Sequence, residues 1–230
     1  MTRNVLLTGA NRGLGLGLAK AFLAKGYDVH ATARHPDHAR ELWELEADYK
    51  GRCHLHTLDV TSDEQLQTLG EKLANVPIHV LVNNAGVLPS WSSSFLDLNK
   101  IDLLKAFEVN TIAPIRVTQT FLPHLKEAGR PIVATLSSLM GSIYDNTSGG
   151  AYAYRISKTA VNMWNKSFAI DHPWLTAVVL HPGWVKTDMG GVNAPTEIDD
   201  SVAGLMQVLG RLKPEDSGHF IDFQGRDIPW

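Results

Sequence analysis

A short apolar run, followed at once by a glycine-rich turn and a helical pattern, opens the chain and constrains its fold more than any other feature. The run is Val5-Leu6-Leu7, the turn spans Thr8 to Gly15, and apolar residues then recur at helical spacing as far as Leu23. A strand, turn and helix in this order point backbone N–H groups and a helix N-terminus at a phosphate group, and glycines let a pyrophosphate approach closely. Because the spacing is Gly-x-x-x-Gly-x-Gly rather than Gly-x-Gly-x-x-Gly, the glycines alone fit a dinucleotide site or an ordinary β-to-α turn equally well.

Strand and helix patterns alternate along the rest of the chain. Apolar runs predict strands at residues 5–8, 28–33, 54–58, 78–82, 132–136, 177–180 and 220–222. Amphipathic stretches lie between these runs, and Gly26, Gly51 and Gly129 mark helix ends just before new strands. This order predicts an α/β fold with a parallel sheet of about seven strands and helices on both faces. Since 230 residues with 44% hydrophobic content can bury one complete core, we expect a single domain over residues 1–230.

Charge and composition exclude several classes of partner. Lysine and arginine number 21 against 24 aspartates and glutamates, and without a basic stripe the sequence predicts no binding of nucleic acid. No apolar run approaches the ~20 residues that span a bilayer, so no membrane partner is expected. The first strand begins too close to Met1 for a signal peptide, and the lone Cys53 cannot form an internal disulfide, which favours a cytoplasmic protein. The ten histidines show no metal-ligand spacing, and no metal is predicted.

Tyr154 and Lys158, near the start of an alanine-rich helical stretch, are the strongest candidates for chemistry. Residues four apart share a helix face, so the phenol and the ammonium group can meet. A neighbouring cation lowers the pKa of a tyrosine below its usual value of about 10 and makes the hydroxyl a usable acid. The rival Tyr152 lies about 240° around the helix from Lys158 and faces away. A tyrosine four residues before a lysine is common on helix surfaces, so the surrounding sequence must decide whether this pair belongs to an active site.

The chain as a whole resembles the short-chain dehydrogenase/reductase family, whose members have a doubly wound Rossmann fold. The resemblance rests on ordered segments that match the family's motifs: Thr8 to Gly15, Asp59-Val60, Asn83 to Gly86, Asn110, Ser138, Tyr154 with Lys158, and Pro182-Gly183 with Thr187. Two further stretches, 181–189 and 222–230, are similar to the sniffer and C-factor group of carbonyl reductases.

The resemblance implies a catalytic tetrad of Asn110, Ser138, Tyr154 and Lys158. In this tetrad Lys158 hydrogen-bonds the nicotinamide ribose, Tyr154 donates a proton to the substrate oxygen, and Ser138 holds that oxygen. The family pattern Ser-Ser-x-x-Gly selects Ser138 over Ser137, for which a cap or turn hydrogen bond is the more natural role.

Asn110 also has an argument from the sequence itself. It lies in a helical stretch, residues 99–126, that contains Pro114. Because proline has no N–H, the carbonyl of Asn110 loses its helical partner. In the family, a water on this carbonyl continues a proton path from Lys158 to solvent. A tolerated helix kink with a surface asparagine is the alternative.

The end of the second predicted strand indicates which nicotinamide cofactor fits. A carboxylate there would bind the ribose 2′-hydroxyl of NAD and repel a 2′-phosphate, but the strand ends in Arg34 and no acid follows until Asp37. Arg34 can offer a planar fork to phosphate, and Arg12 can approach the same group, so we predict NADP(H). Asp59 either accepts from the adenine amino group or caps the helix that begins near Ser62. The residues expected to bind the cofactor are Gly9, Asn11, Arg12, Gly13, Leu14, Gly15, Arg34, Asp59, Val60, Asn84, Ala85, Gly86, Tyr154, Lys158, Pro182, Gly183, Val185 and Thr187.

These features predict an NADPH-dependent oxidoreductase that reduces the carbonyl group of small apolar aldehydes, ketones or quinones, with Tyr154 as the general acid. The alternative is an NADP-binding signalling or regulatory protein, similar to C-factor, with little turnover. A sugar-nucleotide epimerase shares the glycine turn and the Tyr–Lys pair, but it usually adds a substrate domain for which 230 residues leave little room.

Two expectations concern the surroundings of the site. Apolar side chains near the nicotinamide favour apolar carbonyl substrates, and the candidates are Trp91, Met140, Ile143, Tyr144, Trp184 and Met189. Residues 189–200, with Gly190-Gly191 as a hinge, are expected to form a lid. A homodimer or homotetramer is also expected, because the family's monomeric carbonyl reductases carry a helical insertion between the positions of Ser138 and Tyr154, and here the intervening segment is short.

Overall fold

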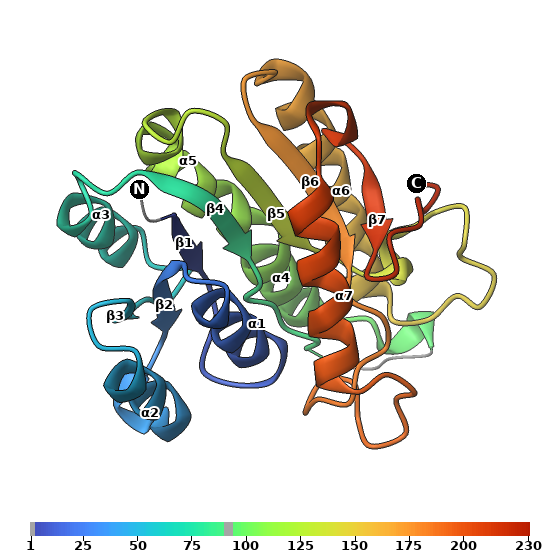
Figure 1. Ribbon diagram of the computed structural model, residues 1–230. Coiled ribbons are helices and arrows are strands. Elements are labelled where there is room, and N and C mark those ends of the chain that lie inside the picture. Colours follow the sequence, from blue (N-terminus) through green and yellow to red (C-terminus); the bar gives the residue numbers. More distant parts are fainter. Residues whose placement is uncertain (1–2, 90–93) are drawn as a thin grey trace.

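The computed structural model describes residues 3–89 and 94–230, and this part of the chain is built around one sheet. The sheet has seven strands in the order β3-β2-β1-β4-β5-β6-β7, and neighbouring strands pair in parallel (Figure 1). The strands are β1 (Asn4–Leu7), β2 (Asp28–Ala33), β3 (Cys53–Thr57), β4 (Ile78–Asn83), β5 (Ile132–Leu136), β6 (Thr176–His181) and β7 (Phe220–Asp222). The α-helices are α1 (Gly13–Ala24), α2 (Arg40–Asp48), α3 (Asp63–Lys72), α4 (Lys100–Phe107), α5 (Ala113–Lys126), α6 (Tyr152–Asp171) and α7 (Ile198–Arg211). The predicted α/β fold with a doubly wound parallel sheet is confirmed.

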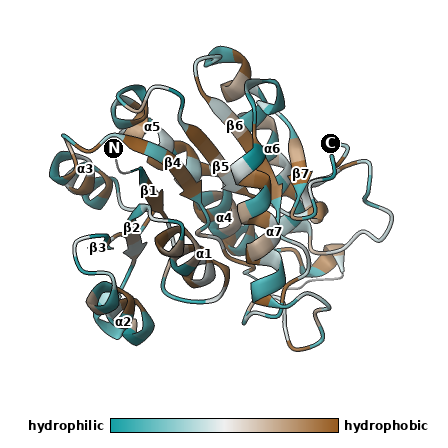
Figure 2. Ribbon diagram, viewed as in Figure 1, coloured by the Kyte–Doolittle hydropathy of each residue, from teal (hydrophilic) through white to brown (hydrophobic). Residues whose placement is uncertain are grey.

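Helices cover both faces of the sheet, which explains why the strands read as continuous apolar runs (Figure 2). Successive residues of a strand point to opposite faces. In β1, Val5 and Leu7 belong to the buried cluster that also contains residues of α1, α2 and α7. Leu6, between them, belongs to the cluster with residues of α3, α5 and α6. The strand β1 is therefore buried on both sides.

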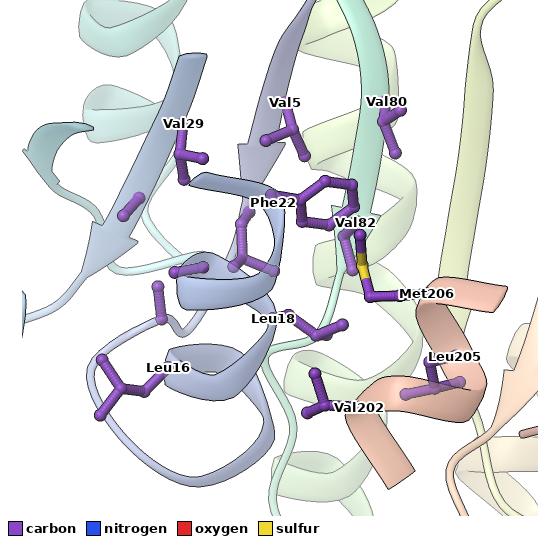
Figure 3. Close-up of a cluster of buried hydrophobic side chains, with 14 of the residues drawn as sticks. Val5, Leu16, Leu18, Phe22, Val29, Val80, Val82, Val202, Leu205 and Met206 are labelled. Carbon is purple, nitrogen blue, oxygen red and sulfur yellow. The ribbon is translucent and has the colours of Figure 1, made fainter. Parts of the chain in front are cut away.

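The packing of α1 against α7 shows how tightly the first helix is held. Figure 3 shows Leu18 and Phe22 of α1 beside Val202 and Met206 of α7, and all four side chains are buried. A Cβ on Gly17 would lie 2.8 Å from a methyl carbon of Val202, so the glycine lets the two helices approach closely. Burying each side chain of this size contributes about 1.5–3 kcal/mol. This packing fixes α1, whose N-terminus follows the glycine-rich turn.

The long helical stretch predicted from 99 to 126 is present but is not uniform. Its middle, Glu108–Ile112, forms a π-helical turn between α4 and α5, in which the N–H of Ala113 bonds the carbonyl of Glu108. Pro114 lies in the first turn of α5, just after the π-helical turn, and not at a simple proline kink. Single π-helical turns inside α-helices occur often at functional sites. Asn110 lies within the turn.

Two smaller expectations need correction. The helix α3 is capped by Ser62, whose Oγ accepts from the N–H of Gln65 at 3.3 Å, and not by Asp59. The expected lid of residues 189–200 overlaps a helix, because α7 begins at Ile198; a lid role for residues 189–197 stays a prediction. The predicted helix ends at Gly26, Gly51 and Gly129 all have positive φ, as expected of glycines that terminate helices.

The order of strands places a ligand site at a definite edge of the sheet. The chain winds from β1 outward to β3 in one direction and from β4 to β7 in the other, so the direction reverses between β1 and β4. In open sheets of this kind, ligands bind in the crevice at the carboxyl ends of the strands beside such a reversal. Within the ranges 3–89 and 94–230, no helix has the length and apolar character needed to cross a membrane.

Candidate active site

The glycine turn after β1 is held in a conformation that only glycine fits well. Gly9 and Gly13 have φ values of +67° and +53°. A Cβ on Gly9 would lie 3.1 Å from Cα of Ala85, and a Cβ on Gly15 would overlap the carbonyl oxygen of Gly9. The turn is therefore compact, and it leaves the N-terminus of α1 open toward the crevice.

Hydrogen bonds from the end of β4 support this turn. Nδ2 of Asn84 donates to the carbonyl oxygens of Thr8 and Gly9 at 2.8 and 2.9 Å. In return, Oγ1 of Thr8 accepts from the N–H groups of Asn84 and Ala85 at 3.0 and 3.1 Å. Since the side-chain amide of Asn84 is already used by the turn, its part in cofactor binding is mainly to shape the glycine turn.

Arg12, Arg34 and Asp59 surround the outer end of the crevice. Arg12 forms an ion pair with Asp188, in the loop after β6. Arg34 follows β2 directly and is exposed. Partial burial raises the pKa of Asp59, but hydrogen bonds from Thr61 and the charges of Arg34 and Lys105 outweigh this effect, so the pKa is lowered overall. Both arginines line the crevice, and their contact with the 2′-phosphate of NADP stays a prediction.

Tyr154 lies in the first turn of α6 and faces Ser138, which follows β5. Ser138 hydrogen-bonds the Tyr154 hydroxyl, and its Oγ also accepts from the N–H of Met140 at 3.2 Å. Ser138 is therefore the residue that caps the short helix Leu139–Gly141, a role that the sequence had suggested for Ser137. Ser137 is buried, and its Oγ lies 3.5 Å from the carbonyl oxygen of Lys158.

The expected lowering of the tyrosine pKa is not what the structure shows. Burial raises the pKa of Tyr154 to about 12, against a smaller opposite effect of the hydrogen bond with Ser138. Burial also lowers the pKa of Lys158 to about 8. The ammonium group of Lys158 donates to the carbonyl of Leu136 at 2.9 Å and lies 5.7 Å from the centre of the Tyr154 ring. At neutral pH the phenol is therefore protonated, which is the state that a proton donor needs.

Asn110 is buried and ties three segments together. Its Oδ1 accepts from the N–H of Val87 at 2.8 Å, while its Nδ2 donates to the carbonyl of Val87 at 2.9 Å and to Oγ of Ser157 at 3.0 Å. A Cβ on Gly86 would lie 3.3 Å from Oδ1 of Asn110 and 3.7 Å from Nζ of Lys158. Asn110 and Lys158 thus converge on the segment after β4, and a surface position for Asn110 is excluded.

Two residues that sequence reasoning missed hold this arrangement in place. Ser157 receives the bond from Asn110 and donates to the carbonyl of Tyr154 at 2.8 Å. Nδ1 of His181, at the end of β6, accepts from the N–H of Leu139 at 3.2 Å. Burial lowers the pKa of His181 to about 4, so the ring is neutral and can accept this bond. Nothing in the local sequence distinguishes such residues, because their partners are distant along the chain.

A cavity of about 940 Å³ runs along this edge of the sheet. The predicted cofactor residues that line it are Gly9, Asn11, Arg12, Gly13, Leu14, Gly15, Arg34, Asp59, Val60, Asn84, Ala85, Gly86, Tyr154, Lys158, Pro182 and Thr187. Gly183 and Val185 support the wall instead: a Cβ on Gly183 would lie 2.9 Å from the ring of Phe223, and Val185 is buried and bridges to Thr196. The cavity also receives Lys105 and other side chains that the sequence did not single out. The contacts of the predicted residues with a cofactor stay predictions.

Only some of the apolar side chains expected near the nicotinamide line the cavity. Met189 lines the cavity, whereas Ile143, Tyr144 and Trp184 are exposed and do not belong to its lining. Trp91 lies outside the described residues. Across ranges 3–89 and 94–230, no group of three or more His, Cys, Asp and Glu side chains is placed to hold a metal ion.

Comparison with known proteins agrees with this geometry. The family model described as short chain dehydrogenase matches residues 3–197. The C-signal protein of Myxococcus xanthus is 46% identical over 156 residues, which cover 67% of this chain and 93% of that protein. Carbonyl reductase Sniffer of D. melanogaster has a TM-score of 0.95 at 34% identity, with 100% of both chains covered. NADPH-bound carbonyl reductase from chicken fatty liver has a TM-score of 0.93 at 35% identity, covering 100% of this chain and 99% of that one.

The resemblance inferred from the motifs is thereby confirmed, including its similarity to the sniffer and C-factor group. The family model covers most of the chain, and the matched segment includes the glycine turn, Asn110, Ser138, Tyr154 and Lys158. The chain belongs to the short-chain dehydrogenase family of oxidoreductases.

Proposed function

We propose that this protein reduces the carbonyl group of small apolar aldehydes, ketones or quinones with NADPH. The observation that carries the proposal is the placement of two groups of residues at one cavity. Tyr154 and Lys158 line the cavity, with Ser138 in hydrogen-bond contact with Tyr154, and Arg12 and Arg34 line it as well. NADPH, when bound, supplies the hydride that adds to the carbonyl carbon.

The residues of the chain supply binding, orientation and the proton. The compact glycine turn admits a pyrophosphate close to the backbone, and two arginines near the predicted position of the 2′-phosphate favour NADP(H) over NAD(H). Ser138 orients the substrate oxygen toward Tyr154, whose raised pKa keeps the hydroxyl protonated until the oxygen becomes basic. Lys158 binds the ribose hydroxyls, and Asn110 keeps the surrounding segments in register.

The proposal is tested by turnover with a panel of aldehydes, ketones and quinones. We expect oxidation of NADPH, measured by its absorbance, to exceed that of NADH with the same substrate. In the variant Tyr154→Phe we expect turnover to fall about 10²–10⁴-fold while NADPH still binds, because the substitution removes the proton donor and little else. Full activity of this variant would show that another group donates the proton.

A signalling protein with little turnover is the second candidate, and the similarity to C-signal favours it. Such a protein would bind NADPH through the same glycine turn. The panel of carbonyl compounds distinguishes the two proposals. Tight binding of NADPH without its oxidation by any compound of the panel would support the signalling protein. Because all four tetrad residues are present, we favour the enzyme.

We further propose that two copies associate through the outer face of α4 and α6, as a homodimer or as half of a homotetramer. Ile156, Met163 and Ile170 recur every seven residues on α6, and all three are exposed. Exposed apolar side chains also lie on α4, which packs against α6, including Ile101 and Leu104. A two-fold axis near Met163 would place Ile156 of one copy against Ile170 of the other and bury the apolar face of both.

A further inference from the structure

We propose that Arg155 is a positioning residue for the carbonyl substrate, and that it acts by fixing the segment Ser142–Ala151 as one wall of the substrate site. The inference rests on the proposed reductase function. Arg155 directly follows Tyr154 in α6, while the segment connects the short helix after Ser138 to α6. The segment therefore lies between Ser138 and Tyr154, two members of the tetrad, along the chain.

The guanidinium group of Arg155 holds the end of this segment with several hydrogen bonds. Nε donates to the carbonyls of Gly149 and Gly150 at 3.1 and 3.2 Å. Nη2 donates to Oγ of Ser148 at 2.9 Å, and Nη1 lies 3.5 Å from the carbonyl of Met140. One side chain thus links the end of the segment, and Met140 shortly before its start, to the helix that carries Tyr154.

The backbone at these contacts has an unusual conformation that needs such support. Gly149, Gly150 and Ala151 have φ values of +66°, +67° and +44° in succession. The left-handed conformation is unfavourable for alanine and persists only where surrounding contacts impose it. The N–H of Arg155 bonds the carbonyl of Ala151 at 3.0 Å, so both the backbone and the side chain of Arg155 stabilise this entry into α6.

The other side of the segment is held by the end of the described chain. Oγ of Ser142 donates to the carbonyl of Pro229 at 2.6 Å, and the N–H of Tyr144 donates to the carbonyl of Trp230 at 3.0 Å. The ring of Trp230 stacks on Phe220 of β7. In Figure 1 the C-terminal end lies beside the yellow loop that leads from β5 to α6.

This support matters because the segment presents apolar side chains to solvent. Ile143 and Tyr144 are 72% and 79% exposed. They follow the helix Leu139–Gly141, which is fixed to α6 by a bond of 3.0 Å from Oγ1 of Thr159 to the carbonyl of Gly141. An apolar substituent on a substrate carbonyl held at Ser138 would bury these side chains. Arg155 therefore affects the binding of that substituent more than the transfer of the proton.

The test compares the variants Arg155→Met and Arg155→Lys with the wild-type enzyme. At saturating NADPH we expect Arg155→Met to raise KM for the carbonyl substrate about tenfold and to change kcat less than about twofold. The Kd for NADPH should be unchanged, and Arg155→Lys, which keeps a donor, should restore part of the loss. The control is Arg116→Met, since Arg116 is an exposed arginine on α5 that bonds Asp63 and Gln119 far from this segment, and we expect it to leave KM unchanged.

Hydrogen exchange provides a readout that does not depend on activity. The N–H groups of Tyr144, Asp145 and Gly149 are hydrogen-bonded, and we expect Arg155→Met to speed exchange in peptides that cover 142–150 while α6 stays protected. Should Arg155→Met not fold, Ser142→Ala removes the support on the opposite side and is expected to change exchange and KM in the same direction.

Each result decides between support and rejection. Faster exchange together with the higher KM supports the proposal. An active enzyme whose variants keep wild-type exchange, or whose KM stays unchanged although exchange is faster, overturns the role of Arg155. A wild-type protein that binds NADPH but reduces no carbonyl overturns the proposed function and with it the substrate role of this segment.

Discussion

Gly15 is packed against the backbone of its own turn, with no room for a side chain. A Cβ there would overlap the carbonyl of Gly9 and lie 2.6 Å from Nδ2 of Asn84. We expect Gly15→Ala to lower the free energy of unfolding by about 1–3 kcal/mol, measured by urea denaturation, and to weaken NADPH binding. Gly210→Ala is the control, because a Cβ at Gly210 in α7 would meet no described atom within 4 Å apart from its chain neighbours and the backbone of its own helix. It should leave stability unchanged or raise it by up to about 1 kcal/mol, and equal effects of the two substitutions would contradict this account.

Arg34 is the residue on which the preference for NADPH depends most directly. A hydrogen bond to a charged group contributes about 1.5–3 kcal/mol, so Arg34→Ala should raise the Kd for NADPH about 10–100-fold and leave the Kd for NADH nearly unchanged. Calorimetric titration with both cofactors measures this difference. Arg116→Ala, at an exposed position of α5, is the matched control. An equal loss for both cofactors would place Arg34 away from the 2′-phosphate.

The identity of the site residues could be predicted from sequence, but several of their roles could not. Tyr154 and Lys158 were identified by their spacing, and the structure places both at the cavity. The raised pKa of Tyr154 was missed because burial depends on the whole fold. Asn84 was predicted to bind the cofactor, yet its amide supports the glycine turn, which only the approach of β4 to β1 reveals.

At the scale of elements, β2 and β3 carry a buried pair of histidines whose protonation opposes folding. Nδ1 of His30 lies 3.1 Å from Nε2 of His56, and His54 stacks on His30. Burial, with the neighbouring histidines and Lys72, lowers the pKa of His30 to about 4 and that of His56 to about 3. In the unfolded chain both groups have a pKa near 6.5. Between pH 6.5 and 4 the unfolded state therefore binds more protons than the folded state.

This difference predicts a stability that is complete above pH 6.5 and falls as the pH drops below it. Each histidine should contribute a slope of up to about 1.4 kcal/mol per pH unit in that range. Urea denaturation at pH 7.5, 6.5 and 5.5 measures the slope, which His30→Gln and His56→Gln should each reduce. His38→Gln, at an exposed position, should leave it unchanged. If the slopes of all three variants match the wild type, the buried pair does not control acid stability.

Elements were more predictable than their irregularities. The seven predicted strands agree with the observed ones within about one residue, since a strand buried on both faces reads as an apolar run. The π-helical turn Glu108–Ile112 was not predicted, because apolar periodicity cannot distinguish it from α-helix over so few residues. Pro114 indicated that the helix is irregular near this place, but not that the irregularity is a π-helical turn.

At the scale of the whole molecule, the exposed apolar face of α4 and α6 predicts an oligomer. A charge at the proposed two-fold axis should disrupt it, so Met163→Glu is expected to convert a dimer to monomer, or a tetramer to dimer, in analytical ultracentrifugation. Trp43→Glu is the control, because Trp43 is 52% exposed on α2, at the other side of the sheet. A wild-type monomer, or an unchanged assembly in Met163→Glu, would contradict the proposed interface.

The most direct test of the central claim follows one hydrogen atom from cofactor to product. NADPH that carries deuterium at both hydrogen positions of the reactive carbon of its nicotinamide ring is incubated with the protein and an apolar ketone, and the alcohol is analysed by mass spectrometry. We predict that the wild-type enzyme forms alcohol carrying one deuterium on the former carbonyl carbon, and that Tyr154→Phe forms almost none although it binds NADPH. Unlabelled alcohol, or no alcohol from folded wild-type protein saturated with NADPH, would contradict the account.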